Sequence, residues 1–233
     1  MPMQDKLKTV TFSYDDGTTQ DRRLIEIFNR YGLKATFNLN SGLLGEPNGL
    51  IREEVTVAHV RPRACEIRDI YAGHEVAAHT LTHPNLRALP DDEVVRQVEE
   101  DRKRLSDIVG YEVIGMAYPG GGVNYDPRVI RLIREQTVVR YARTTVCTGS
   151  FVLPDVLLEF KPTAYHHGHL AELFALGEAF LAAKAEKPML FSVWGHAFEF
   201  DIHNDWGEFE AFCRMISGQK DVAYCTNREA LSV

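Results

Sequence analysis

The chain has 233 residues, of which 45% are hydrophobic and 25% charged, and this balance predicts one globular domain over residues 1–233 with a substantial core. The formal net charge of -7 argues against a general nucleic-acid-binding or anionic-membrane-binding surface. The chain as given begins with no apolar stretch of signal-peptide length, and no later segment approaches the roughly 18 apolar residues of a membrane span. We therefore expect a cytoplasmic protein.

The first predicted strand, residues 9–14, ends in a pair of acids within the segment TFSYDDG. Two adjacent carboxylates, Asp15 and Asp16, repel one another unless a proton or a cation lies between them. The pair therefore predicts a functional site whose positive partner comes from elsewhere in the chain.

Strand-like and helix-like patterns alternate along the rest of the chain. Apolar stripes with helical spacing predict helices over 21–31, 91–109, 126–135, 169–184 and 206–217. Short buried runs predict strands over 35–39, 73–78, 114–118, 138–142, 189–194 and 222–224. This βα repetition lacks a glycine-rich dinucleotide fingerprint, which favours a barrel-like α/β fold over a Rossmann sheet. Segments 40–64 and 144–165 are expected to be loops that line the substrate cleft.

Two histidines follow the predicted strand 73–78, in the segment HTLTH. The four-residue spacing of His79 and His83 places both imidazoles on one face of a helical turn or tight loop, where they can chelate one ion. In sheets wrapped by helices the strand ends carry function, so these histidines and the acid pair can meet there. Asp-Asp-Gly also occurs in ordinary turns, and the two histidines could instead cap a helix or lie on the surface.

Later polar residues leave more alternatives open. His196 follows the strand 189–194 and is either a catalytic group or a core histidine bonded to a backbone carbonyl. Glu199 could orient it or contact a substrate. His166, His167 and His169 are crowded enough to suggest a second metal site, but no acid or cysteine completes a ligand set, so they are expected to be loop residues at the cleft. The four cysteines, without paired spacing, are expected to be reduced core residues.

The order of these motifs, TFSYDDG, HTLTH, AYPGG and SVWGHAFEF, resembles the polysaccharide deacetylase family, also called the NodB-homology family or carbohydrate esterase family four. The resemblance implies a distorted (β/α) TIM-like barrel and one divalent metal ion, usually zinc, with cobalt, nickel or iron compatible. It implies that Asp15 is the general base and His196 the general acid. The metal ligands that it implies are Asp16, His79 and His83.

The third motif, residues 117–121, departs from the family pattern because its arginine is missing. In the family this arginine orients the catalytic aspartate, and Arg143 is our candidate to replace it. Gly120 occupies the position whose backbone N–H faces the oxyanion, although the glycine run is equally typical of a flexible turn. The expected substrate contacts are Tyr118, Pro119, Arg143 and Trp194.

These residues predict a metal-dependent hydrolase that removes acetyl groups from N- or O-acetylated saccharides by attack of an activated water. A cytoplasmic chain would act on a small or soluble saccharide. One alternative is a cyclic amide hydrolase of the allantoinase or imidase type, which acts on a small amide. Another is a catalytically silent saccharide-binding domain. Neither a nucleic acid nor a membrane is an expected partner, and the oligomeric state does not follow from the sequence.

Overall fold

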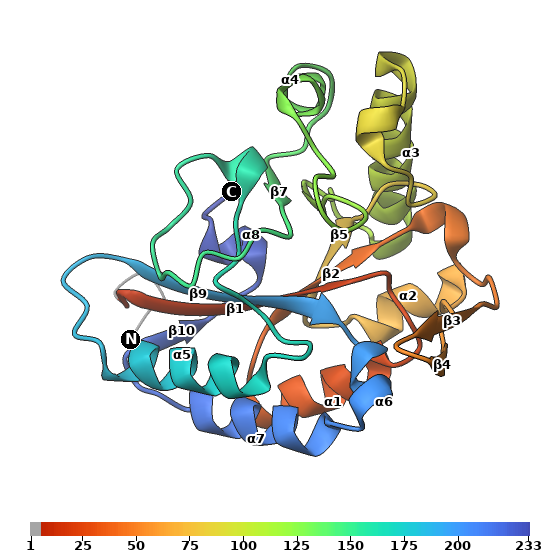
Figure 1. Ribbon diagram of the computed structural model, residues 1–233. Helices are drawn as coiled ribbons and strands as arrows, with labels where there is room; N and C mark the ends of the chain where they lie inside the picture. The colour runs from red at the N-terminus through yellow and green to blue at the C-terminus, as the bar shows by residue number, and fades with distance from the viewer. Residues whose placement is uncertain (1–5) are drawn as a thin grey trace.

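Eight parallel strands pair in one curled sheet in the order β7-β6-β5-β2-β1-β9-β8, and β10 also pairs with β1 (Figure 1). This computed structural model describes residues 6–233. The strands are β1 (Lys8–Asp15), β2 (Ala35–Leu39), β5 (Glu75–Ala78), β6 (Gly115–Ala117), β7 (Tyr141–Arg143), β8 (Ala164–Tyr165), β9 (Met189–His196) and β10 (Val222–Tyr224). The sheet forms a half-barrel, so the predicted distorted α/β barrel is confirmed.

Helices cover both faces of the sheet, with α1, α5 and α7 on one side and α3 and α4 on the other (Figure 1). The α-helices are α1 (Asp21–Tyr31), α2 (Ala64–Ile70), α3 (Asp91–Val109), α4 (Pro127–Gln136), α5 (Leu170–Ala182), α6 (Glu199–His203), α7 (Trp206–Ile216) and α8 (Asn227–Ala230). The 3₁₀ helices are η2 (Ser41–Leu43), η3 (Leu86–Ala88) and η4 (Leu157–Glu159). Among residues 6–233, no helix is long and apolar enough to cross a bilayer.

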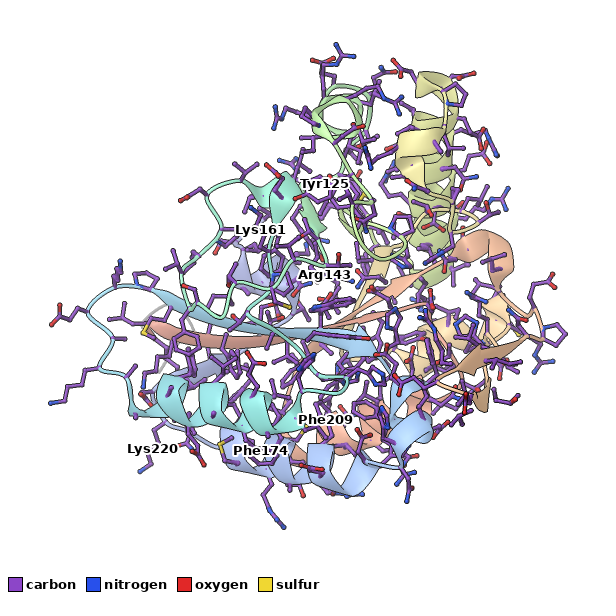
Figure 2. All side chains as sticks on the ribbon, in the orientation of Figure 1. Tyr125, Arg143, Lys161, Phe174, Phe209 and Lys220 are labelled. Atoms are coloured by element: carbon purple, nitrogen blue, oxygen red, sulfur yellow. The ribbon has the colours of Figure 1, made fainter. Side chains whose placement is uncertain are left out.

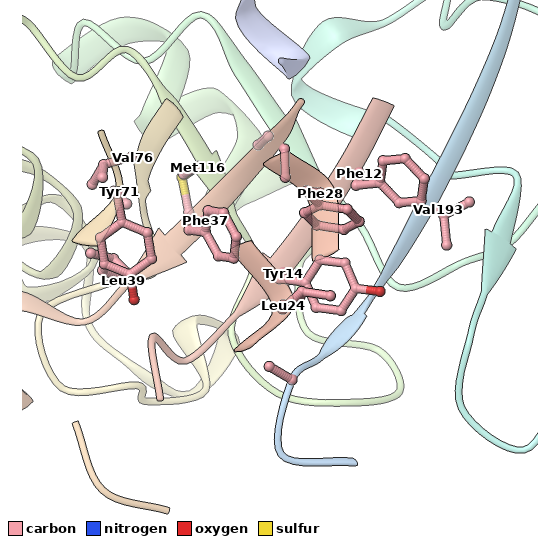
Figure 3. Packing of buried hydrophobic residues seen from close by; sticks show 14 of the residues in the cluster. Phe12, Tyr14, Leu24, Phe28, Phe37, Leu39, Tyr71, Val76, Met116 and Val193 are labelled. Carbon is pink, nitrogen blue, oxygen red and sulfur yellow. The ribbon is translucent and has the colours of Figure 1, made fainter. Parts of the chain in front are cut away.

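The core lies between the apolar stripes of these helices and the sheet. The ring centroids of Phe12 from β1 and Phe28 from α1 are 4.7 Å apart, and Tyr14 and Phe37 extend the same aromatic layer (Figure 3). The predicted helices 21–31 and 91–109 are confirmed at both ends. A strong apolar stripe and a following glycine are local signals, so the sequence alone could place these helices.

The segment expected to be a loop over 40–64 instead contains an antiparallel hairpin, β3 (Gly49–Arg52) and β4 (Val55–Ala58). Its strands pair only with one another and are largely exposed, so the sequence carries no buried strand pattern there. The cysteine prediction is wrong for Cys65 and Cys147, which are exposed.

Strand β1 sets the position of the site. It pairs with β9 along its whole length, and this register places Asp15 beside His196. On its other edge β10 pairs with the first half of β1 and β2 with the second half, where Asp15 faces Asn38. Because the strands are parallel, these three residues meet at the carboxyl edge of the sheet.

Candidate active site

Asp15 is the last residue of β1, and its carboxylate is held from two sides. Nδ2 of Asn38 donates a hydrogen bond to Oδ1 (2.8 Å), and the buried Arg143 guanidinium donates to Oδ2. Figure 2 shows Arg143 in the interior of the molecule, beside the central strands. Burial alone would raise the pKa of Asp15, but the charge of Arg143, followed by that of His79, lowers it. The ionised form of Asp15 is therefore favoured, and its carboxylate is held in one orientation.

Asp16 follows directly, and its two carboxylate oxygens have different surroundings. Oδ2 accepts a hydrogen bond from Nε2 of His59 (2.9 Å). Oδ1 is buried without a hydrogen-bond partner in residues 6–233, and lies 3.5 Å from Nε2 of His83 and 3.8 Å from Nε2 of His79. Burial opposes ionisation of Asp16, yet the hydrogen bond from His59 and the surrounding histidines hold its pKa below the ordinary range.

This arrangement fits a divalent cation. One ligand atom each from Asp16, His79 and His83 lies within 4.8 Å of the other two. Ligands bonded at about 2.1 Å in a tetrahedral shell are about 3.4 Å apart, close to the spacing seen here. Within residues 6–233, the Asp16 oxygen that faces the two imidazole nitrogens accepts no hydrogen bond, so it is available as a ligand for a cation.

The other contacts of His79 leave its Nε2 available to bind an ion. Its Nδ1 lies 2.9 Å from the carbonyl oxygen of Ala117, which assigns the ring proton to Nδ1 and leaves the Nε2 lone pair for an ion. Burial lowers the pKa of His79 to about 4, so the imidazole is neutral at neutral pH. His79 and His83 lie in a tight loop after β5, with His83 at a φ of 60°.

Asp101 of α3 supports the same loop, although the sequence analysis did not single it out. Its carboxylate accepts hydrogen bonds from the backbone N–H groups of Ser41 (2.6 Å) and His79 (2.9 Å). Burial raises the pKa of Asp101 to about 7, against the effect of these hydrogen bonds. A signal was present, because Asp101 falls on the buried stripe of its helix, where an acid needs a partner.

His59 and Arg61, which follow β4, were also missed. Nη1 of Arg61 lies 3.5 Å from Nδ1 of His59, and arginine can only donate, so His59 accepts at Nδ1 and donates from Nε2 to Asp16. Nη2 of Arg61 lies 3.9 Å from Oδ1 of Asp16. No motif spacing connects these residues to the acid pair, since the hairpin brings them there.

We expect His59→Ala to weaken zinc binding by roughly 10- to 100-fold, the usual effect of removing a group that orients a metal ligand. Competition with a chromophoric chelator measures the affinity. His59→Gln, which keeps a donor, should lose less. His74→Ala is the matched control, because His74 is equally buried but bonds Asn29 and Ala35 instead. An unchanged affinity in His59→Ala would show that Asp16 needs no such support.

His196 ends β9 beside Asp15 and is held by Glu199. Its Nδ1 lies 3.0 Å from Oε1 of Glu199, and its backbone N–H donates to Oε2 (3.0 Å). Burial disfavours the charged imidazole, but Glu199, Asp16 and Asp15 together raise the pKa of His196 to about 9. His196 is thus an imidazolium at neutral pH, the form required of a proton donor.

A buried chain of side chains fixes Glu199 in turn. Nε2 of His166 lies 2.9 Å from Oε2 of Glu199, Nδ1 of His166 lies 3.1 Å from the Tyr14 hydroxyl, and the Tyr165 hydroxyl donates to Oε1. A Cβ at Gly195 would lie 2.3 Å from Nε2 of His166, so this approach requires glycine. The expectation that His166 is a cleft residue is therefore wrong.

We expect Glu199→Gln to lower the pKa of His196 from about 9 toward its ordinary value of 6.5. Protonation of His196 contributes stability that is fully present below pH 6.5 and is lost as pH rises through about 9. That pH-dependent contribution should shrink in the variant. NMR titration of the metal-free protein, with urea unfolding across this pH range, measures both. If the pKa of His196 is the same in Glu199→Gln as in the wild type, Glu199 is not the group that raises it.

Two expected substrate contacts are placed differently by the structure. The buried Tyr118 donates its hydroxyl proton to the Leu158 carbonyl oxygen (2.9 Å) and does not offer it to a substrate. Arg143 is fully buried against Asp15, which makes it a positioning residue rather than a substrate contact. The contact with Asp15 agrees with the expectation that Arg143 replaces the missing motif arginine. The burial of Tyr118 depends on distant segments, so the sequence could not indicate it.

The other expected contacts remain near the edge of the sheet. Pro119 is buried, whereas Gly120 is exposed with a φ of 82°, a conformation that favours glycine. The rings of Trp194 and Tyr165 stack with centroids 4.4 Å apart. Trp194 and Cys147 both line a cavity of about 450 Å³. The candidate metal ligands and His196 do not line this cavity, so a substrate contact of Trp194 stays a prediction.

Comparisons with known proteins identify the family of this chain. A family model described as polysaccharide deacetylase matches residues 3–139, more than half of the chain. Among curated proteins, the peptidoglycan-N-acetylglucosamine deacetylase PgdA of Listeria monocytogenes serotype 1/2a is 28% identical over 127 residues. The match covers 53% of this chain and 24% of that protein, so this chain corresponds to about a quarter of its relative's length.

Two solved structures show the same fold over nearly the whole chain. A probable polysaccharide deacetylase from Pseudomonas aeruginosa PAO1 has a TM-score of 0.75 at 12% identity, covering 98% of this chain and 91% of that one. Puue allantoinase has a TM-score of 0.74 at 11% identity, covering 97% and 90%. At these identities the likeness concerns the fold alone. The family match, together with the four motifs, shows that the chain belongs to the polysaccharide deacetylase family.

Proposed function

We propose that this protein is a metal-dependent hydrolase that removes an acetyl group from an N- or O-acetylated saccharide. One observation carries the proposal: Oδ1 of Asp16 is buried and faces Nε2 of His79 and Nε2 of His83. Within residues 6–233 this oxygen has no hydrogen-bond partner. Asp15 and His196 flank this set from adjacent strands, with the protonation states needed for a base and an acid.

Each group then has one task. When bound, a divalent ion, with zinc preferred and cobalt, nickel or iron compatible, polarises the acyl carbonyl and acidifies water. Asp15 accepts a proton as the water oxygen bonds to the acyl carbon. The Gly120 N–H donates to the developing oxyanion. His196 protonates the leaving nitrogen or oxygen as its bond to the acyl carbon breaks, which releases acetate and a free amine or alcohol.

An N-acetylated sugar is the first substrate to try, because the Listeria relative is named as a deacetylase of peptidoglycan N-acetylglucosamine. The missing third-motif arginine keeps a cyclic amide as the second candidate. The same base, acid and ion could open a ring amide by the same attack of water.

The test is an activity screen on protein loaded with zinc or cobalt. Substrates are N-acetylglucosamine oligomers, O-acetylated xylo-oligosaccharides and cyclic amides, with enzymatic measurement of acetate and of ring opening. We expect acetate release that requires metal. Ring opening without acetate would instead assign a cyclic amide hydrolase. No turnover by metal-loaded protein would assign a silent saccharide-binding domain.

A further inference from the structure

The turn of the β3–β4 hairpin brings together a second group of metal-ligating side chains, outside the Asp16 site. Glu53 lies in the turn, His167 follows β8, and His203 is the last residue of α6. Nε2 of His167 lies 3.0 Å from Oε1 of Glu53, and Nε2 of His203 lies 3.2 Å from Oε2. One ligand atom from each residue lies within 4.8 Å of the other two.

The turn itself is held in an unfavourable conformation. Glu53 and Glu54 have φ values of 49° and 65°, the left-handed pair that hairpin turns usually assign to asparagine and glycine. Glutamate keeps such a conformation only where its surroundings hold it there. In this structure Glu53 contacts two imidazoles from segments more than one hundred residues away in the chain.

The charges at this cluster favour a divalent ion over a simple ion pair. The rings of His167 and His203 stack with centroids 4.9 Å apart and planes at 28°, so two imidazolium charges would repel one another. A divalent ion accepts both Nε2 lone pairs and is offset by the Glu53 carboxylate. Two imidazoles and one carboxylate are a recurrent ligand set for zinc and related transition metals.

The surrounding groups are consistent with an additional ligand. Within residues 6–233, the buried Nδ1 of His167 and Oδ1 of Asp205 have no hydrogen-bond partner.

We propose that Glu53, His167 and His203 bind a second divalent transition-metal ion that fastens the β3–β4 hairpin to the segment after β8 and to α6. The hairpin leads directly into the segment that carries His59, the donor to Asp16. The second ion therefore stabilises the support of the first site without taking part in the reaction.

Equilibrium dialysis with zinc, followed by elemental analysis, tests the proposal on the full chain. The wild type should bind two zinc ions per chain, and His167→Ala or His203→Ala should bind one. His169→Ala is the matched control, because His169 lies in the same segment but is exposed, and its imidazole lies 3.7 Å from Glu172 rather than at the cluster. It should still bind two. Circular dichroism checks folding, and the exposed Glu53→Gln replaces any variant that fails to fold.

Removing the first site separates the two ions. Asp16→Asn/His83→Ala should still bind one zinc, and adding His203→Ala should weaken that binding at least tenfold. Zinc should slow hydrogen exchange over residues 49–58 in the former protein and not in the latter. The proposal is overturned if His167→Ala and His203→Ala both still bind two zinc ions. It is also overturned if the wild type binds only one zinc and Asp16→Asn/His83→Ala loses it. If the wild type binds only one zinc and Asp16→Asn/His83→Ala keeps it, the hairpin site is supported and the first site is contradicted.

Discussion

Asp15→Asn is expected to give a folded, metal-loaded protein whose turnover is about 100- to 10,000-fold lower than that of the wild type, the usual contribution of a general base. The asparagine side chain still has a carbonyl oxygen to accept the hydrogen bond from Arg143, so the fold should persist with reduced stability. It cannot accept a proton at neutral pH. Elemental analysis and kinetics on the substrate identified by the screen measure metal content and turnover together.

Asp16→Asn is the matched comparison and should show the opposite pattern. Its Oδ1 faces His79 and His83, and a neutral amide supplies no charge to an ion otherwise held by neutral imidazoles. Metal content should fall, and activity should fall with it. If Asp15→Asn loses the metal while Asp16→Asn keeps it, the two roles are reversed. If both variants stay active, the acid pair is only a turn.

Arg143→Met is expected to lower the free energy of unfolding by about 3–5 kcal/mol, because it leaves the buried Asp15 carboxylate without its cation. Both side chains are almost fully buried, so solvent cannot replace the lost partner. The double variant Arg143→Met/Asp15→Asn should recover part of the loss, since no unpaired charge remains. Urea unfolding of the metal-free proteins gives these values.

The control is an exposed ion pair. Arg22 and Glu66 lie 2.8 Å apart, with side chains 49% and 30% exposed, so Arg22→Met should cost at most about 1 kcal/mol. A similar small cost for Arg143→Met, or no recovery in the double variant, would show that Arg143 and Asp15 do not stabilise one another as proposed.

The features that the sequence alone determined are those with local signals. The helices over 21–31 and 91–109 follow from an apolar stripe and a glycine, which act within one element. The acid pair and the HTLTH histidines stood out because they follow predicted strands, and parallel strands bring such ends to one edge of a sheet. These patterns predicted that the acid pair and the two histidines meet, and the resemblance to the polysaccharide deacetylase family then implied Asp16, His79 and His83 as the candidate ligand set.

Only the tertiary structure decided what supports these residues. His59 reaches Asp16 across 43 residues and Arg143 reaches Asp15 across 128, and a hairpin with no local strand signal positions the first of these contacts. In the structure Arg143 and Tyr118 are buried and contact protein groups, and His166 contacts Glu199. The Arg143–Asp15 contact agrees with the candidate that the resemblance suggested for the missing motif arginine. The other roles depend on burial between segments distant in the chain, so no local pattern could assign them.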